Sequence, residues 1–422
     1  MATKNLLLFT KKFPYGHQET YLFNELPFLS KAFHKVIIVP YDEFLYKENE
    51  NRLSEFSNVE VYCVNKKTEK LSFNHLVKRE LMVWRILCFE LFRGREPINH
   101  FKFYKRNSSQ IKHSFACAVA LNKYLAENNI SNYKLYNYWL HGGIIISTIM
   151  NKLVNKTNTN IVSRAHAYDV YHKDWYSIYP NSAYLFLAFE KWKLHHTEKI
   201  ATISTHGYNH FVRLYPQYKD KLSVSRLGVI EQKSVSNSTK GNTLTWITCS
   251  NIDENKRVYR IPELISKMQM NVNWFHFGKE SSQSDLAKLQ DEINKYQIRD
   301  KCNLMGFKPN SEVISFYQNN NVDLILNLSQ IEGIPVSLME ASSFGIPMVA
   351  TNTVGNPEIV NNENGFLIDV EFNTDDLAKS LNAYFYNAEL IEKKRSASKN
   401  TFLNYYDASK NYPEFIKTML SN

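Results

Sequence analysis

The sequence predicts an α/β protein with two parallel β-sheets, each interleaved with helices. Short apolar runs alternate with helical patterns from residue 5 to residue 227, and the alternation starts again at residue 244. Such alternation is typical of βαβ units, whose strands run parallel because a helix crosses back between them. A polar stretch rich in Ser, Lys and Asn, residues 231–242, separates the two series like a linker. We therefore predict domains at 1–232 and 243–400, followed by a helical end at 401–422.

Length and composition agree with two globular domains. The chain has 422 residues, of which 44% are hydrophobic and 22% charged. We expect no transmembrane helix, because no apolar run reaches about 20 residues. We expect no signal peptide either, since residues 1–5 lead directly into a strand. The five cysteines are dispersed and form no C-x-x-C pair, which predicts a reducing cytosol and neither disulfides nor a zinc site.

The individual elements follow from apolar runs and turn residues. In the first domain we expect strands at 5–10, 35–40, 59–64, 133–140, 160–165, 199–204 and 222–227, and helices at 19–33, 81–92 and 144–154. In the second domain we expect strands at 244–250, 273–278, 302–307, 322–328 and 347–351, and helices at 257–270, 311–319, 335–344 and 374–421.

The segment 322–360 carries two carboxylates at a suggestive spacing. Glu332 lies in the loop after a buried strand, and Glu340 lies in the helix that Pro335 opens and Gly345 ends. At helical rise their separation would be roughly 12 Å. A carboxylate suits the vicinal hydroxyls of a sugar, and the helix N-terminus between the two suits a diphosphate. The segment therefore predicts a site that holds a nucleotide sugar at three points.

The same segment resembles the E-x7-E signature of glycosyltransferase family 4, which comprises retaining, nucleotide-sugar-dependent enzymes. The matching residues are Glu332, Gly333, Pro335, Glu340, Ala341, Gly345, Pro347 and Glu358. The resemblance implies the GT-B fold, two Rossmann-like domains that face each other across a cleft, with a last helix that crosses back to the first domain. It implies that Glu332 contacts the donor hexose and Glu340 the ribose. One departure is the sequence Gly355-Asn356-Pro357-Glu358, where the family usually has two glycines.

Two further loops resemble segments of that family. In SRAHAYDVY the resemblance implies that His166 reaches the donor sugar and phosphate, and a His at the end of a parallel strand also faces the ligand crevice. A structural His–Asp pair is the alternative. In residues 249–257 the family supplies an Arg and a Lys to the diphosphate, and Lys256 matches the Lys. Ser250 or Asn251 stands at the Arg position, so either Arg257 takes that role or the role is lost; a solvated pair on the surface is the alternative.

The expected site residues fall into three groups. The catalytic group is Glu332, His166 and Lys256; the donor-binding group is Glu340, Arg257, Gly333, Ile334, Pro335, Val336, Gly355 and Glu358; and the acceptor-side group is Gly16, His141, Gly142 and Asp169. Gly16 lies in the loop after the first strand, where an ordinary βα connection is the alternative. Gly142 and Gly143 allow a tight turn with backbone close to a ligand. No cofactor and no metal is expected, since no Asp-x-Asp cluster stands at a strand end.

The charge distribution predicts an anionic partner. The net charge is +10, and residues 65–113 contain twelve basic against four acidic residues. The apolar stretch Leu81 to Phe92 lies in this region. It is either a core helix with a solvated basic flank or a face that rests on anionic lipid through Trp84, Phe89 and Phe92. Nucleic acid is not expected as a partner, because no recognisable binding motif is present.

The interpretation is a cytoplasmic enzyme, peripheral on the inner face of the plasma membrane. It would move a hexosyl group, with retention, from a UDP- or GDP-sugar to a glycan or lipid-linked acceptor in cell-surface polysaccharide synthesis. Two alternatives stay open. One is a sugar-nucleotide-binding pseudoenzyme that serves a partner transferase, and the other is an epimerase that acts on the nucleotide sugar itself.

Overall fold

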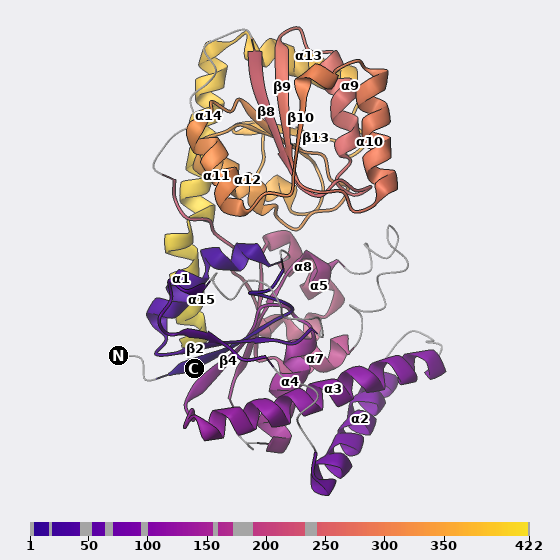
Figure 1. The fold of residues 1–422 in the computed structure, drawn as a ribbon, viewed down its shortest axis with the longest axis vertical. Helices are drawn as coiled ribbons and strands as arrows, with labels where there is room; N and C mark the ends of the chain where they lie inside the picture. The colour runs from indigo at the N-terminus through magenta and orange to yellow at the C-terminus, as the bar shows by residue number, and fades with distance from the viewer. Residues whose placement is uncertain are drawn as a thin grey trace. The chain divides into compact units, whose positions relative to one another are not determined.

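The computed structural model describes residues 4–16, 19–42, 53–63, 71–93, 100–154, 159–171, 189–232 and 243–420. The chain divides into two compact units (Figure 1). The first unit contains residues 1–203, 207–225 and 412–422, and the second contains 204–206 and 226–411. The first boundary therefore lies at Ser225 rather than at residue 232, because Val229 already pairs with Asp407 of the second unit.

The first unit is built on a seven-stranded parallel sheet. Its strands are β1 (Asn5–Thr10), β2 (Val36–Pro40), β3 (Val59–Val61), β4 (Tyr133–Asn137), β5 (Ile161–Ala165), β6 (Lys199–Thr202) and β7 (Leu222–Val224), in the order β3-β2-β1-β4-β5-β6-β7. The chain winds outward in one direction from β1 and in the other from β4. Ligands of such sheets bind at this switch point, beyond the carboxyl ends of the strands.

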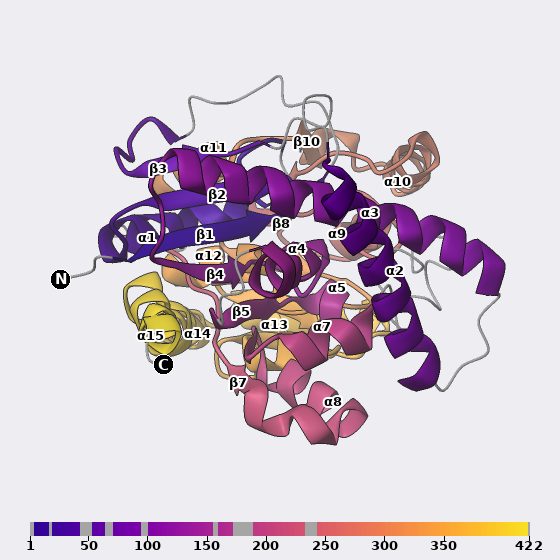
Figure 2. The same cartoon turned by 90° about the horizontal axis from the view of Figure 1, so that it is seen from below.

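Helices cover both faces of this sheet. They are α1 (Leu26–Ala32), α2 (Phe73–Arg93), α3 (His100–Glu127), α4 (Gly142–Ile149), α5 (Ala167–Val170), α7 (Glu190–His196) and α8 (Thr205–Leu214). Alternate residues of β1 point to opposite faces: Leu7 and Phe9 pack with α2, α3 and α4, whereas Leu6 and Leu8 pack with α1 and the end of the chain. Figure 2 shows α2 and α3 together, at one extremity of the first unit.

The second unit has a six-stranded parallel sheet. The strands β8 (Thr243–Cys249), β9 (Asn271–Phe277), β10 (Cys302–Gly306), β11 (Leu324–Asn327), β12 (Met348–Thr351) and β13 (Gly365–Ile368) lie in the order β10-β9-β8-β11-β12-β13. Its helices are α9 (Ile261–Ser266), α10 (Gln283–Lys295), α11 (Asn310–Asn319), α12 (Val336–Ser343), α13 (Thr374–Phe385) and α14 (Ala388–Thr401). Here the switch point lies between β8 and β11.

Every strand predicted from the sequence is present, with ends that differ by a few residues. Two predicted helices are shorter. The one expected at 19–33 is a 3-10 turn, Thr20–Asn24, followed by α1, and the one expected at 257–270 is a 3-10 turn, Val258–Arg260, followed by α9. In both cases a proline near the first helical position marks where the α-helix begins. The long helix α3 and the strand β13 were not predicted.

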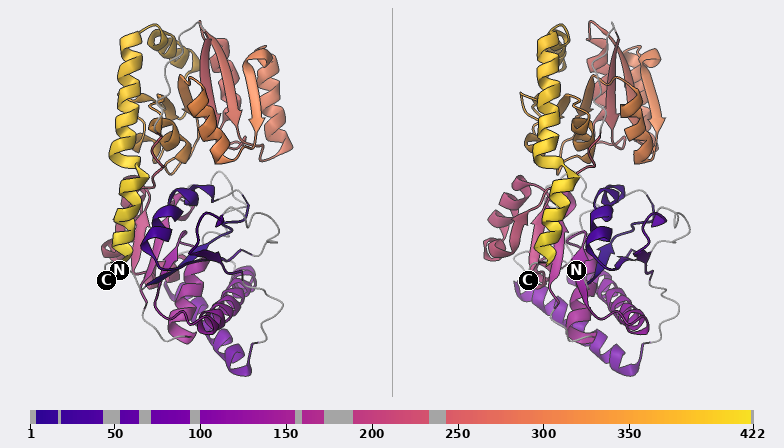
Figure 3. Two further views of the ribbon diagram at one scale, coloured as in Figure 1. Left: turned by 60° about the vertical axis from the view of Figure 1, so that its left-hand side comes forward. Right: turned by 90° about the vertical axis from the view of Figure 1, so that its left-hand side faces the viewer.

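The end of the chain belongs to the first unit. Helix α14 continues through a π-helical turn, Phe402–Tyr406, into α15 (Ala408–Leu420), and the residues from Tyr412 onward pack on the first sheet (Figure 3). A buried network lies beneath them. The Arg164 guanidinium donates to the Glu25 carboxylate at 3.2 Å and to the Tyr136 hydroxyl at 2.9 Å, and Phe415 stacks on it with the ring centroid at 3.9 Å. Both charged side chains are fully buried.

Removing one partner of this buried ion pair should destabilise the first unit strongly. In Arg164→Met the Glu25 carboxylate would stay buried without its cation, which typically costs about 3–5 kcal/mol. We expect this loss in urea denaturation of the full chain. The matched control is Lys295→Met, which breaks a surface ion pair with Glu292 and should leave the free energy of unfolding almost unchanged. Equal losses in the two variants would contradict the assignment.

Candidate functional site

The two strands at the second switch point bring together loops that are far apart in sequence. β8 and β11 are parallel neighbours, with Trp246 opposite Leu324 and Ile247 opposite Ile325. The loop 250–257 follows β8 and the loop 328–335 follows β11, so both leave the same edge of the sheet. Predicted site residues lie in each loop, and the order of the strands makes them neighbours.

Asn255 joins these two loops. Its side chain, almost fully buried, donates to the Ile331 carbonyl at 3.1 Å and accepts from the Ile331 N–H at 3.0 Å. Its own carbonyl accepts from the Gln330 N–H at 2.8 Å. An asparagine amide offers a donor and an acceptor side by side, as a peptide group does. Three hydrogen bonds therefore hold the loop before Lys256 against the loop before Glu332.

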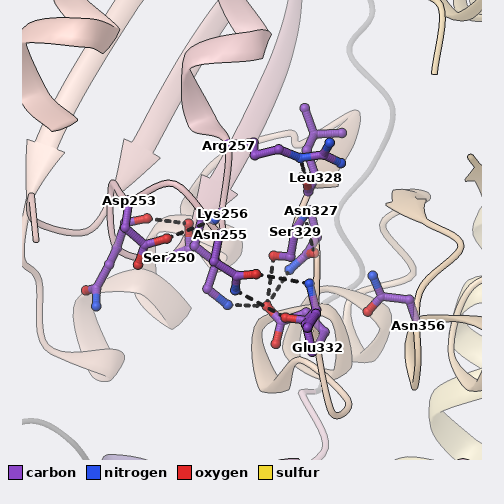
Figure 4. A network of polar contacts seen from close by, with 12 residues as sticks. Ser250, Asp253, Asn255, Lys256, Arg257, Asn327, Leu328, Ser329, Glu332 and Asn356 are labelled. Carbon is purple, nitrogen blue, oxygen red and sulfur yellow. Dashed lines mark hydrogen bonds and ion pairs between the residues drawn. The ribbon is translucent and has the colours of Figure 1, made fainter. Parts of the chain in front are cut away.

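Lys256 and Glu332 form an ion pair at this place (Figure 4). The Glu332 carboxylate also accepts from the Ser329 hydroxyl at 3.0 Å and from the Asn327 amide at 3.4 Å. Both charged side chains are partly accessible to solvent, 23% for Lys256 and 13% for Glu332. The two groups that the sequence assigned to the diphosphate and the sugar thus lie together and neutralise each other.

A third loop, after β12, closes the site from the other side. The Gly355 N–H donates to the Glu332 carbonyl at 3.2 Å, and the hydroxyls of Thr351 and Thr353 donate to the carbonyls of Ser329 and Gln330. A Cβ on Gly355 would overlap the Gly333 carbonyl oxygen, so no larger residue fits. Gly355 therefore allows the two loops to touch through their backbones.

The Asn356 side chain fixes the loop where the family usually has a second glycine. It is fully buried and donates to the Thr351 carbonyl at 3.0 Å. The departure from the family pattern therefore ties the turn back to the end of β12. The short 3-10 turn that follows, Asn356–Glu358, begins directly after Gly355.

Helix α12 starts one residue later than predicted, with Pro335 as its N-cap residue. Glu340 lies in this helix and is 6% exposed. Burial raises the pKa of its carboxyl to about 7, although the Asn310 amide donates to it at 2.7 Å and opposes the shift. Ile334 is buried and Val336 half-buried, so the start of α12 combines apolar contact with backbone N–H groups. Glu340 would gain hydrogen bonds from a ligand that carries hydroxyls.

Two predicted donor residues are engaged elsewhere. Arg257 is turned into the second unit, where its guanidinium donates to the Leu328 carbonyl at 2.7 Å and to Glu371 at 3.0 Å (Figure 4). The structure therefore does not bring Arg257 to the Lys256–Glu332 pair. The backbone of Arg257 is left-handed (φ 50°), and its side chain points away from that of Lys256. The Glu358 carboxylate accepts from the N–H groups of Thr205 and His206 and from the Arg226 guanidinium. These contacts give Glu358 a structural role within the second unit.

In the first unit, His166 and Asp169 cap a short helix. The His166 N–H donates to the Asp169 carboxylate at 3.0 Å, and the ring Nε2 lies 2.9 Å from the Tyr138 carbonyl. A carbonyl only accepts, so the proton is on Nε2. Burial lowers the pKa of His166 to about 3 and raises that of Asp169 to about 6. The imidazole is therefore neutral and fixed in orientation. These contacts are compatible both with the predicted catalytic role and with the alternative of a structural His–Asp pair.

Two residues that the sequence analysis did not single out organise the first switch point. Glu19 is 3% exposed and accepts from the backbone N–H groups of Lys11, Lys12 and Phe13 at 2.6–3.0 Å and from the Trp139 indole at 2.6 Å. The Trp139 ring packs on His166 with centroids 4.4 Å apart. Glu19 thus links the loop after β1 to the residues after β4 and β5. A lone Glu after a loop gives no sequence signal for this, since Trp139 lies 120 residues away.

The other acceptor-side residues have local explanations. Gly16 has a positive φ of 69°, and no atom lies within 4 Å of a Cβ added there, so it serves the turn. His141 precedes α4 and stacks on Tyr41 with centroids 6.1 Å apart. A Cβ on Gly142 would lie 3.3 Å from Tyr41, and one on Gly143 would overlap the Asn137 side chain. Protein side chains thus lie close to the backbone at both glycines.

Neither a metal cluster nor a membrane span occurs among the described residues. Within the ranges given above, no group of three His, Cys, Asp or Glu side chains could hold a metal ion. Within the same ranges, no helix combines the length and the apolar character needed to cross a bilayer.

Two doubly wound parallel-sheet units define the GT-B class of folds, and solved structures of this class match along the whole chain. HepE of Anabaena, solved in complex with UDP, superposes with a TM-score of 0.68 over 100% of both chains at 14% identity. A glycosyltransferase from Rickettsia africae gives a TM-score of 0.66 over 99% of both chains at 16% identity. At such low identity these likenesses establish the fold alone.

Sequence comparison finds similarities for the second unit. Residues 229–402 match the family model described as Glycosyl transferases group 1. The putative colanic acid biosynthesis glycosyltransferase WcaL of Salmonella typhimurium is 31% identical over 156 residues, which cover 35% of this chain and 38% of that protein. The amylovoran biosynthesis glycosyltransferase AmsK of Erwinia amylovora is 35% identical over 86 residues, which cover 19% and 21%. The matches span well under half of these relatives, and residues 229–402 are similar to the group 1 glycosyltransferase domain.

The contact between the two glycine loops can be tested by adding one methyl group. Gly355 has an ordinary φ of −96°, so Gly355→Ala introduces a steric clash without dihedral strain. We expect a loss of about 1–3 kcal/mol in the second unit and a loss of nucleotide binding, because the loop after β11 must move.

The control is Gly306→Ala, at a glycine with φ 67° and no atom within 4 Å of the added Cβ. It should cost about 1 kcal/mol through strain and leave nucleotide binding intact. Thermal unfolding with and without UDP measures both. Unchanged UDP binding in Gly355→Ala would show that the loop contact does not shape the site.

Proposed function

We propose that the protein is a retaining glycosyltransferase. It transfers a hexosyl group from a UDP- or GDP-sugar to a hydroxyl of a glycan or lipid-linked acceptor in cell-surface polysaccharide synthesis. The observation that carries the proposal is the pairing of Lys256 with Glu332 at the switch point of the group 1 domain. The names of the relatives, which refer to colanic acid and amylovoran biosynthesis, and the UDP complex of HepE agree with it.

In the proposed reaction the bond between the anomeric carbon and the diphosphate oxygen breaks, and the acceptor oxygen bonds to the same face. The acceptor proton passes to the departing phosphate. Lys256 and the backbone N–H groups at the start of α12 stabilise the negative charge that grows on the leaving diphosphate. Glu332 holds hydroxyls of the hexose and Glu340 those of the ribose. No metal ion or cofactor enters the proposal, because these groups meet the charge themselves.

In the proposed reaction, donor binding replaces the ion pair between Lys256 and Glu332 by contacts of both side chains with the donor. Lys256 must release the Glu332 carboxylate to contact the diphosphate, and Glu332 becomes available to the sugar hydroxyls. An ion pair between partly accessible side chains is weak, so the exchange demands little free energy. His166, held by Tyr138 and Trp139 in the first unit, keeps its proposed catalytic role as a neutral imidazole.

Action at the inner face of the plasma membrane is part of the proposal, since polysaccharide precursors are commonly carried on lipids. A second candidate function is a sugar-nucleotide-binding subunit without turnover of its own. The burial of Arg257 favours it, because the proposed diphosphate contact then depends on Lys256 without help from a neighbouring arginine.

Turnover of labelled donors by the purified chain separates the two candidates. We expect transfer from a UDP- or GDP-hexose to a lipid-linked or glycan acceptor, with NMR of the product reporting retained configuration. Lys256→Ala should lower turnover by about 10²-fold or more, as loss of one preorganised electrostatic donor does. The control is Lys288→Ala, which breaks an exposed pair with Glu254 and should leave the rate unchanged. Donor binding without turnover would support the subunit instead.

Donor affinity should depend on pH through Glu340. Its pKa of about 7 lies above the ordinary value, so the carboxyl is protonated below neutrality and gains charge above it. The ionised form accepts hydroxyl hydrogen bonds better, so UDP affinity should rise as the pH passes through 7. Glu340→Gln should weaken UDP and UDP-sugar alike and remove this dependence.

Glu332→Gln is the matched control, because it should weaken the UDP-sugar while it leaves UDP nearly unaffected. Calorimetric titration between pH 6 and pH 8 measures all four combinations, in a range centred about the Glu340 pKa. Equal losses for both ligands in both variants would overturn the assignment of sugar and ribose.

A further inference from the structure

Helix α2 has two apolar faces, and only one of them belongs to the core. Met82, Val83, Ile86 and Leu87 are buried against the first sheet and its helices. Five large apolar side chains of α2 are exposed instead: Leu76 is 37% exposed, and four others are more so, Phe73 81%, Val77 44%, Leu81 64% and Trp84 59%. The spacing of Phe73, Val77, Leu81 and Trp84, four, four and three residues, places these four in one stripe along the helix.

This stripe differs from the face expected from the sequence. Phe89, counted there as an anchor, packs against the core beside Trp192, His195 and His196. The side chain of Phe92 lies outside the described residues. Trp84 is the one predicted anchor that the structure exposes. Isolated exposed apolar residues are common, but a stripe of four on one helix marks an interaction surface.

The charges beside the stripe select the partner. Lys78 and Arg85 are exposed on α2, one residue after Val77 and one after Trp84. Among the described side chains of α2 the acid is Glu80, which is already paired with Arg79 at 2.7 Å and Lys112 at 3.2 Å. The exposed side of α2 therefore carries apolar and cationic groups together, a combination that fits the interface of an anionic bilayer.

We propose that α2 docks the first unit on an anionic lipid surface. Phe73, Val77, Leu81 and Trp84 enter the boundary between headgroups and acyl chains, and Lys78 and Arg85 contact the lipid phosphates. The proposal deepens the proposed function and rests on it for the reason to be at a membrane, but the binding itself needs neither donor nor transfer.

A second copy of the chain is a less favourable occupant of the stripe. In a two-fold contact the same patch meets itself, so the cations of one copy would approach those of the other. Figures 1 and 2 also place α2 at an extremity of the first unit, beside α3, where a flat surface can reach it. A self-association through α2 is therefore an outcome of the test rather than a second proposal.

Vesicle sedimentation tests the proposal with the full chain. The wild type should bind vesicles of phosphatidylcholine mixed with phosphatidylglycerol at low salt and should bind phosphatidylcholine alone at least about tenfold more weakly. Binding should fall with added salt, because exposed charges are screened beyond about 8 Å at physiological ionic strength. A wild type that ignores the anionic vesicles at low salt overturns the proposal.

Two variants of α2 separate its apolar and cationic parts. Leu81→Ser with Trp84→Ser, and Lys78→Glu with Arg85→Glu, should each weaken vesicle binding by tenfold or more, on the order expected for interfacial anchors. The charge-matched control, Lys219→Glu with Arg299→Glu, changes two exposed cations outside α2 and should bind like the wild type. Equal weakening in the control would assign the effect to net charge and overturn the role of α2.

Other measurements keep this test independent of catalysis. The α2 variants should keep wild-type melting temperatures, UDP binding and transfer to a water-soluble acceptor, whereas Lys256→Ala should lose transfer and keep vesicle binding. Sedimentation velocity reports the oligomeric state. A dimer that dissociates in the Leu81→Ser, Trp84→Ser variant would assign the stripe to a second copy and overturn the lipid proposal.

Discussion

The candidate donor site depends on one constraint, the adjacency of β8 and β11. The second sheet winds away from this pair in opposite directions, so the loops after both strands leave the same edge and meet. Asn255 then ties them through reciprocal hydrogen bonds with Ile331, and Lys256 reaches a carboxylate that lies 76 residues further along the chain. Gly355 completes the arrangement because only a residue without a side chain lets the third loop touch the second.

Two buried glutamates show how hydrogen-bond partners separate a structural role from a binding role. Glu19 accepts from three backbone N–H groups and an indole, so its burial is compensated within the protein. Glu340 has a single amide partner among the described residues, and burial raises its pKa from the ordinary 4.5 to about 7. Because the folded-state pKa is the higher one, ionisation of Glu340 opposes folding increasingly as the pH rises from 4.5 to 7. A buried carboxyl with a raised pKa and few hydrogen-bond partners is typical of a site that binds a ligand with hydrogen-bond donors.

The aromatic and cationic residues of the first unit also fall into two groups, those buried in the core and those exposed to solvent. Arg164 and Glu25 are buried with each other and with Phe415, so they hold the end of the chain on the first sheet. Phe89 and Trp84 are five residues apart on α2, yet one packs against the core and the other stands in solvent. The helix therefore stabilises the first unit with one face and exposes large apolar side chains on the other.

The sequence by itself determined the two parallel sheets and the positions of all their strands except β13, because these follow from local hydrophobic patterns. It also singled out Glu332 and Glu340 as candidate ligand contacts, from a motif within one segment. It also pointed to Lys256 from the residues of a single loop. Only the tertiary structure decided that Arg257 turns toward Leu328, that Glu19 binds Trp139 and that Phe89 packs against the core while Leu81 is exposed. Each of these depends on which distant segment packs against the residue. A shift of one residue along a helix turns the side-chain direction by about 100°, which is enough to move it from the core to the surface.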